Sequence, residues 1–253
     1  MADVIYIKYN RTRKEEFQIK TEILEENGTK WVEKSALTEA GKAHIRSFRD
    51  KYEALKKQHV NIQAAEPQIS EDGRTARFAY LTGKTLAEVL GENIGSGQAP
   101  VEAIREVLGK ICQVYPEYLS PFVITDRLTE VFGPVPKFQD QAMAVSNIDA
   151  LLENILVTEK GWYFLDYEWV YDFPVPLGFV KYRILFYFYR KYASLMEYAG
   201  PEEFLKEFGM DEELLEAYGD METAFQSYVH GDNQDLYLLN YRKDYRPPSS
   251  WSR

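Results

Sequence analysis

Three oxygen-bearing side chains in the middle of the chain have the types and the spacing that phosphoryl transfer needs. Asp149 is followed five residues later by Asn154 and twelve residues after that by Asp166, which ends an apolar segment. In phosphoryl transfer one Asp orients the attacking hydroxyl, while an Asn oxygen and a second Asp hold metal ions on the phosphates. The Asp–x4–Asn spacing is that of a kinase catalytic loop. The spacing therefore predicts a nucleotide whose phosphates are bridged by Mg2+.

Composition restricts the metal chemistry to oxygen ligands. Among 253 residues there is one cysteine, Cys112, so an intramolecular disulfide and a cysteine-rich zinc site are excluded. The three histidines lie far apart in the sequence, which leaves Asp, Glu and Asn oxygens and favours a hard cation. A formal net charge of −10 disfavours a protein that coats nucleic acid.

The sequence also predicts the cellular compartment of the protein. The N-terminal residues lack the basic and apolar regions of a secretory signal. The most apolar stretch, residues 173–189, is interrupted by two prolines, a lysine and an arginine, so it does not read as a spanning helix. We expect a soluble cytoplasmic protein without a transmembrane segment.

The first 82 residues predict a β-β-β-α-β-β order. Asn27 and Gly28 favour a tight hairpin turn between two strands, because both tolerate positive φ. Thr38 is the expected N-cap of a long helix that ends near residue 58. The expected strands are residues 4–9, 17–24, 31–36, 62–69 and 74–81, and the third of these strands carries Lys34.

The rest of the chain predicts mainly helices. Two short strands, 155–157 and 162–165, flank a charged turn and lead into Asp166. The expected helices are 86–90, capped by Thr85, and 101–112, 179–198 and 211–230. We therefore expect an α+β protein, with an N-terminal part of residues 1–82 that contains the sheet and one long helix and a mainly helical C-terminal part of residues 83–253.

Three segments carry a resemblance to a known fold: 34–40, 146–149 (Ser-Asn-Ile-Asp) and 166–176, which begins Asp-Tyr-Glu-Trp. The sequence resembles the protein-kinase-like fold in its aminoglycoside phosphotransferase and choline kinase branch. It is most similar to the kinase domain of bacterial O-antigen chain-terminating kinase–methyltransferases and their stand-alone relatives. The resemblance covers nearly the whole chain and implies two lobes, with ATP and Mg2+ or Mn2+ in the cleft. It implies that the N-terminal lobe of residues 1–82 binds nucleotide and that the C-terminal lobe of residues 83–253 carries the catalytic loop and the metal-binding Asp and binds the acceptor.

The resemblance also implies roles for individual residues. Lys34 matches the lysine that contacts the α- and β-phosphates, and Asp149 matches the catalytic Asp. Asn154 and Asp166 match the two metal-binding residues. Glu168 remains open between a functional role, a surface charge and a structural ion pair.

Further matches concern the rest of the nucleotide site. By resemblance, Glu53 is the helix glutamate that pairs with Lys34, with Asp50 and Glu39 as alternatives. Tyr80 and Leu81 match the hinge between the lobes, where backbone groups recognise the adenine base.

Two features depart from the family pattern. Asn147-Ile148-Asp149 stands where kinases have His-Arg-Asp, and the segment between Tyr9 and Phe17 has no glycine. Backbone amides of a glycine-free loop cannot approach phosphate as closely. Arginine forks bind phosphate oxygens, so Arg11 and Arg13, with Lys14, are candidate replacements; the alternative is a solvated hairpin tip.

These features together predict a kinase that transfers the γ-phosphoryl group of ATP to a hydroxyl of a small molecule or glycan. The resemblance implies a saccharide acceptor in lipopolysaccharide or other cell-envelope polysaccharide synthesis, with a glycosyltransferase or methyltransferase as partner. The departures motivate an alternative, a catalytically weak or inactive pseudokinase that serves as a nucleotide-binding scaffold. The presence of Lys34, Asp149, Asn154 and Asp166 argues against this alternative. A protein kinase is disfavoured, because no Asp-Phe-Gly or Ala-Pro-Glu follows.

Overall fold

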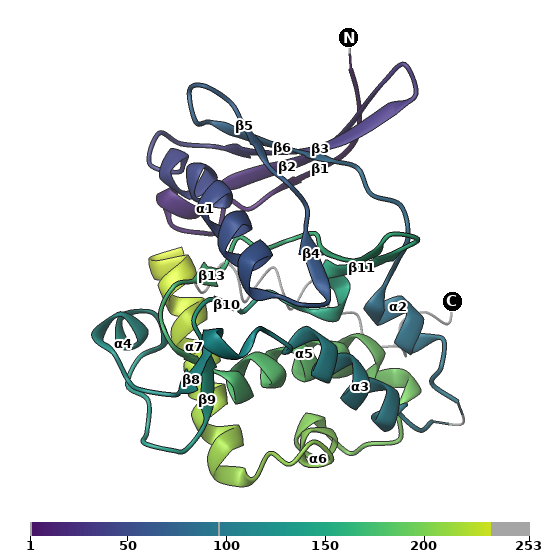
Figure 1. Cartoon of the computed structure of the whole chain (residues 1–253), viewed down its shortest axis with the longest axis vertical. Coiled ribbons are helices and arrows are strands. Elements are labelled where there is room, and N and C mark those ends of the chain that lie inside the picture. The colour runs from purple at the N-terminus through teal and green to yellow at the C-terminus, as the bar shows by residue number, and fades with distance from the viewer. Residues whose placement is uncertain (1, 96, 234–253) are drawn as a thin grey trace. The chain divides into compact units, whose positions relative to one another are not determined.

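The protein is described by a computed structural model that covers residues 2–95 and 97–233 (Figure 1). Two compact units are present: Met1–Arg49 and Pro67–Tyr80 with the described residues from Thr223 onward, and Asp50–Glu66 with Leu81–Glu222. The predicted lobe boundary after residue 82 stays a prediction, and the end of the predicted second lobe lies outside the described residues.

The described elements combine antiparallel strands near the N-terminus with helices that dominate later. The helices are α1 (Lys42–Gln58), α2 (Leu86–Gly91), α3 (Val101–Ile111), α4 (Asp126–Phe132), α5 (Leu177–Tyr192), α6 (Pro201–Lys206) and α7 (Glu212–His230). The strands are β1 (Asp3–Tyr9), β2 (Ile19–Glu26), β3 (Thr29–Ala36), β4 (Ile62–Ala64), β5 (Gln68–Ile69), β6 (Thr75–Ala79), β7 (Lys84–Thr85), β8 (Leu119–Pro121), β9 (Gln141–Met143), β10 (Ser146–Asn147), β11 (Ile155–Thr158), β12 (Gly161–Phe164), β13 (Val170–Tyr171) and β14 (Val175–Pro176). The predicted α+β class is confirmed.

The N-terminal sheet has five antiparallel strands in the order β1-β2-β3-β6-β5, which lie side by side in Figure 1. The predicted hairpin is present: Glu26 pairs with Thr29, and Asn27 and Gly28 have φ values of 53° and 78°. Phe48 of α1 packs edge-on against Phe78 of β6 at 5.6 Å between ring centroids, which helps to anchor the helix on the sheet.

The predicted start of the long helix at Thr38 is wrong, because α1 begins at Lys42. The Thr38 hydroxyl donates to the carbonyl of Glu15 at 2.8 Å and accepts from the amide of Gly41 at 3.1 Å. Thr38 therefore closes a turn that ties the chain to the segment before β2, one turn before the helix begins.

The predicted strand 62–69 is also wrong as a single element. Its first part, β4, pairs in parallel with β12, whereas its second part, β5, pairs antiparallel with β6. Pro67 separates the two parts, and a proline has no N–H for a sheet hydrogen bond. The segment thus contributes to two different sheets.

The second unit contains a four-stranded sheet, β4-β12-β11-β7, and the aromatic helix α5. The predicted cap at Thr85 is confirmed, and Glu88 completes a reciprocal capping box with it at the start of α2. Phe179, Tyr182 and Phe188 of α5 are buried, so the aromatic segment is helical core. The helix ends at Tyr192, six residues before the predicted end, and the short helices α4 and α6 were not predicted.

None of the helices in the described part of the chain is both long enough and apolar enough to span a membrane.

Candidate active site

A compact group of three carboxylates lies in the second unit. Asp149, Asp166 and Glu168 each offer an oxygen, and these three oxygens lie within 4.8 Å of one another. Glu168 is only 3% exposed, and the two aspartates are half-buried. Like charges at this spacing repel unless a cation lies nearby. The donor set is all oxygen, as Mg2+ requires, so the residues present fit a divalent cation.

Backbone pairing brings the two halves of this carboxylate cluster together. Strand β10 pairs antiparallel with β13, with Ser146 opposite Tyr171 and Asn147 opposite Val170. The amide of Ile148 donates to the carbonyl of Trp169 at 3.1 Å. The segment that ends at Asp149 is therefore fixed beside the segment that follows Asp166.

Two asparagines organise the turn after β10. The amide of Asp149 donates to Asn147 Oδ1 at 3.0 Å, so the side chain of Asn147 supports the backbone of this turn. Asn154 Nδ2 donates to the carbonyl of Asp149 at 3.0 Å, and the carbonyl of Asn154 accepts from Leu165 at 2.8 Å. Asn154 thus connects the loop to the strand that delivers Asp166, with its amide oxygen as the atom suited to a metal.

The part of α1 that belongs to the second unit supports both halves of the cluster. Gln58, which is fully buried, donates to the carbonyl of Val145 at 2.6 Å and accepts from its amide at 2.8 Å. Lys51 donates to the carbonyl of Glu168. These contacts join one helix to the backbone on either side of the carboxylate cluster.

Arg183 of α5 is a buried contact of Asp149 that the sequence analysis missed. Its Nη1 donates to the carbonyl of Ile148 and lies 3.4 Å from Asp149 Oδ1, while its Nε lies 2.7 Å from Glu222 Oε2. Burial alone would lower the pKa of Arg183, but the charges of Glu222 and Asp149, with Tyr187, outweigh it and raise the pKa. A charged residue inside the aromatic segment 179–192 was the signal in the sequence.

Lys34 lies in the first unit, on β3 between Thr21 of β2 and Ala76 of β6. It is 4% exposed, and its ammonium lies 5.6 Å from the centre of the Phe48 ring. Lysines are rarely buried to this degree. Lys34 is therefore not an ordinary solvated surface lysine, while its contact with phosphates stays a prediction.

The remaining predicted nucleotide residues are spread over both units. Glu53 lies on the part of α1 that belongs to the second unit and is half-buried. Tyr80, just after β6, is 40% exposed, and Leu81 begins the next stretch of the second unit. Glu39 forms ion pairs with Arg74 and Lys42. Which acid pairs with Lys34 stays a prediction.

The glycine-free turn of residues 10–14 is held mainly through its backbone. Gln18 Nε2 donates to the carbonyl of Arg13 at 2.7 Å and to that of Arg11 at 3.3 Å. The amide of Lys14 donates to the carbonyl of Val229 at 2.9 Å, so it is already used within the chain. Arg11 is exposed, with its guanidinium 4.6 Å from the centre of the Tyr9 ring.

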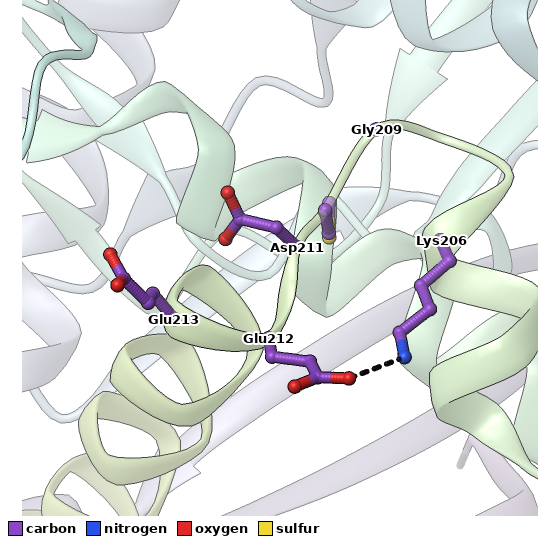
Figure 2. A pocket seen from close by; sticks show the side chains of 6 residues that line it. Lys206, Gly209, Asp211, Glu212 and Glu213 are labelled. Atoms are coloured by element: carbon purple, nitrogen blue, oxygen red, sulfur yellow. Dashed lines mark hydrogen bonds and ion pairs between the residues drawn. The ribbon is translucent and has the colours of Figure 1, made fainter.

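Two surface cavities lie in the second unit, and both are lined by residues other than those predicted for the site. One, of about 600 Å3, contains Asp211, Glu212, Glu213 and Lys206, whose ammonium lies 3.1 Å from Glu212 (Figure 2). The other, of about 470 Å3, lies between α5, α6 and α7 and includes the stacked rings of Tyr182 and Phe186.

Comparisons with known proteins give a weak structural likeness. No family model matches the chain, and no curated protein matches its sequence. Among solved structures, the chain is similar to the macrolide 2'-phosphotransferase MphH from Brachybacterium faecium, with 13% identity, coverage of 93% of this chain and 87% of that one, and a TM-score of 0.41.

Two further solved structures show the same degree of likeness. Aminoglycoside phosphotransferase APH(4)-Ia has 12% identity, coverage of 89% and 94%, and a TM-score of 0.40. Spectinomycin phosphotransferase APH(9)-Ia, solved with ADP and spectinomycin, has 14% identity, coverage of 98% and 89%, and a TM-score of 0.40. At these scores the likeness says nothing about what this chain binds, so the functional argument rests on the site.

Proposed function

We propose that this protein is an ATP- and Mg2+-dependent phosphotransferase that moves the γ-phosphoryl group to a hydroxyl of a small molecule or glycan. The observation that carries the proposal is the carboxylate cluster of Asp149, Asp166 and Glu168, whose oxygens lie within 4.8 Å of one another. Pairing of β10 with β13 brings the segment that ends at Asp149 beside the segment that follows Asp166. Asp149 and Asn154 also have the Asp–x4–Asn spacing of a kinase catalytic loop. Both features support phosphoryl transfer over an incidental acidic patch.

Each residue has a definite task in the proposed reaction. Asp149 orients the acceptor hydroxyl and accepts its proton as the new bond from oxygen to the γ-phosphorus forms. The bond between the γ-phosphorus and the bridging oxygen breaks, and ADP leaves. Asn154 and Asp166 would hold the metal, which neutralises phosphate charge, and Lys34 would contact the α- and β-phosphates. The buried Glu168 is an additional oxygen beside Asp166.

The finer identity of the acceptor is proposed from sequence resemblance. The segments 34–40, 146–149 and 166–176 favour a saccharide acceptor in cell-envelope polysaccharide synthesis in the cytoplasm, with a glycosyltransferase or methyltransferase as partner. A screen of ATP consumption against sugars and oligosaccharides, with aminoglycosides and choline included, tests this. Phosphorylation of choline or an aminoglycoside in preference to every saccharide would contradict the saccharide assignment.

Nucleotide binding is tested first, by thermal unfolding with ATP in the presence and absence of Mg2+ or Mn2+. A ligand that binds only the folded state raises the melting temperature by mass action. We expect a metal-dependent shift that Asp166→Asn reduces. The matched control is Asp172→Asn, which changes an exposed carboxylate six residues later, 2.6 Å from Arg127. Equal, unshifted melting temperatures in all conditions would contradict the proposal.

The scaffold alternative is supported by the turn of residues 10–14. The Lys14 amide is bonded to Val229, and the turn has no glycine, so close wrapping of phosphates by backbone amides is disfavoured. A scaffold would bind nucleotide without turnover. If ATP raises the melting temperature while no acceptor, including water, increases ADP formation, the scaffold is the correct assignment.

A further inference from the structure

Arg183 is a buried arginine that touches the loop on which the proposed chemistry depends. We propose that Arg183 is a positioning residue that fixes Asp149 for catalysis, and that Glu222 and Tyr187 in turn fix Arg183. This inference rests on the phosphotransferase function proposed above. It concerns a residue on helix α5, 34 positions beyond Asp149 in the sequence.

The guanidinium of Arg183 contacts the loop and α7 at the same time. Nη1 donates to the main-chain carbonyl of Ile148 and lies 3.4 Å from Asp149 Oδ1, while Nε donates to Glu222 Oε2 at 2.7 Å. A guanidinium is planar, and its donors point in fixed directions. The contact with Glu222 therefore fixes the orientation of the guanidinium, and the guanidinium in turn fixes the carbonyl of Ile148 and the carboxylate of Asp149.

Tyr187 is a second residue of α5 that holds Glu222. Arg183 and Tyr187 are four residues apart on α5, so they share one face of the helix. The Tyr187 hydroxyl donates to Glu222 Oε1 at 2.8 Å, while Glu222 Oε2 accepts from Arg183. Each carboxylate oxygen of Glu222 thus has its own donor, and Glu222 cannot rotate without losing one of them.

Asp149 needs such support because two other carboxylates lie close to it. Repulsion from Asp166 and Glu168 favours movement of Asp149 away from the cluster. Arg183 supplies the opposite charge at Asp149, and this leaves Asp166, with Asn154, for the proposed metal ion. A buried ion pair seldom stabilises a fold more than apolar packing of the same volume would, so stability alone does not account for an arginine at this place.

The test compares Arg183→Met and Arg183→Lys with the matched control Arg105→Met. Arg105 of α3 also donates to a backbone carbonyl, that of Glu207, and lies 3.5 Å from the carboxylate of Glu102. Turnover is measured from Mg-ATP with the best acceptor of the screen and with water. We expect Arg183→Met to lower kcat about 100-fold, the cost of a small misplacement of a reacting group, while KM for ATP changes less than about threefold. Arg183→Lys should recover part of kcat, and the control should keep wild-type values.

Two milder variants keep the test decisive if Arg183→Met does not fold. Glu222→Gln retains the shape of the side chain and removes its charge, and Tyr187→Phe removes one hydroxyl. Both should lower kcat less than Arg183→Met does and leave KM for ATP unchanged. In an Asp149→Asn background, Glu222→Gln should cause no further loss, because the network acts through Asp149.

The possible outcomes separate this inference from the proposed function. Wild-type kcat in folded Arg183→Lys and Glu222→Gln variants, or a loss that falls on KM for ATP alone, would overturn the positioning role and leave the phosphotransferase intact. A wild-type protein without Mg-ATP binding and without turnover would overturn both. A kcat loss that is absent in the Asp149→Asn background supports the inference.

Discussion

The carboxylate cluster and the turn of residues 10–14 are both charged, but the chain builds them in opposite ways. Asp149, Asp166 and Glu168 are fixed by strand pairing and by buried side chains from α1 and α5. The turn of residues 10–14 carries its charges on side chains of a partly exposed loop and is fixed through backbone carbonyls. The carboxylate cluster is thus held by residues buried around it, whereas the turn presents its charged side chains on a loop that is partly exposed to solvent.

The largest expected effect comes from a change in the carboxylate cluster itself. Asp166→Asn removes one negative oxygen from the proposed metal site, so we expect turnover to fall by about 1,000-fold or more and the Mg2+ requirement to rise. Asp149→Asn should lower turnover to a similar degree with ATP binding nearly intact, because the proposed role of Asp149 is to orient the acceptor hydroxyl. Steady-state kinetics with Mg2+ titration measure both.

The control for these two variants is Asp172→Asn, which changes an exposed carboxylate of the same region. It should match the wild type in turnover. If Asp166→Asn and Asp149→Asn also match the wild type, the cluster is not the site of phosphoryl transfer, and the contrast with the turn of residues 10–14 has no catalytic meaning.

The second prediction concerns a buried residue that supports the carboxylate cluster, with the three carboxylates themselves unchanged. Gln58→Leu leaves both the amide and the carbonyl of Val145 without their side-chain partner. Leaving buried polar groups unpaired should lower the free energy of unfolding by about 3 kcal/mol. Urea unfolding measures the loss, with Gln63→Leu as control, because Gln63 is exposed and donates to the carbonyl of Lys160 at 3.4 Å. Equal unfolding midpoints for the two variants would show that the buried framework is not needed.

The third prediction concerns acid stability. His59 is buried against Phe164, and burial lowers the pKa of its imidazole from 6.5 to about 4. The unfolded chain therefore binds a proton below pH 6.5 that the folded chain does not bind until near pH 4. Stability should fall by about 2 kcal/mol between pH 7 and pH 4.5 through this group, and His59→Leu should show a smaller fall. Chemical unfolding across this pH range measures it; identical pH profiles would exclude the role of His59.

The smallest effect is expected in the turn of residues 10–14. Replacement of both Arg11 and Arg13 by Ala should raise KM for ATP a few-fold, because arginine forks bind phosphate oxygens. Gln18 contacts the carbonyls of these residues, which alanine keeps, so the loss of stability should stay under about 0.5 kcal/mol. Wild-type KM in the double variant would favour the solvated hairpin tip, and Lys160→Ala in another charged turn serves as control.

Elements that depend on neighbouring residues were predictable. The hairpin at Asn27 and Gly28 follows from their tolerance of positive φ, and the start of α2 follows from Thr85, a residue type that favours the N-cap position. The strands before Asp166 follow from apolar segments on either side of a charged turn. Spacing alone also identified Asp149, Asn154 and Asp166 as a set, two of which the structure places in one cluster.

The contacts that complete the site could not be read from the sequence, because they join residues far apart in the chain. Gln58 meets Val145 across 87 positions, and Arg183 meets Asp149 across 34. Strand 62–69 divides between two sheets because β12 offers β4 a parallel partner, which local propensity does not reveal. The sequence by itself thus determined which oxygen-bearing groups the protein has and the local elements that carry them. Only the tertiary structure decided that Glu168 joins them and that Arg183 faces Asp149, because burial and charge pairing depend on the packing of distant segments.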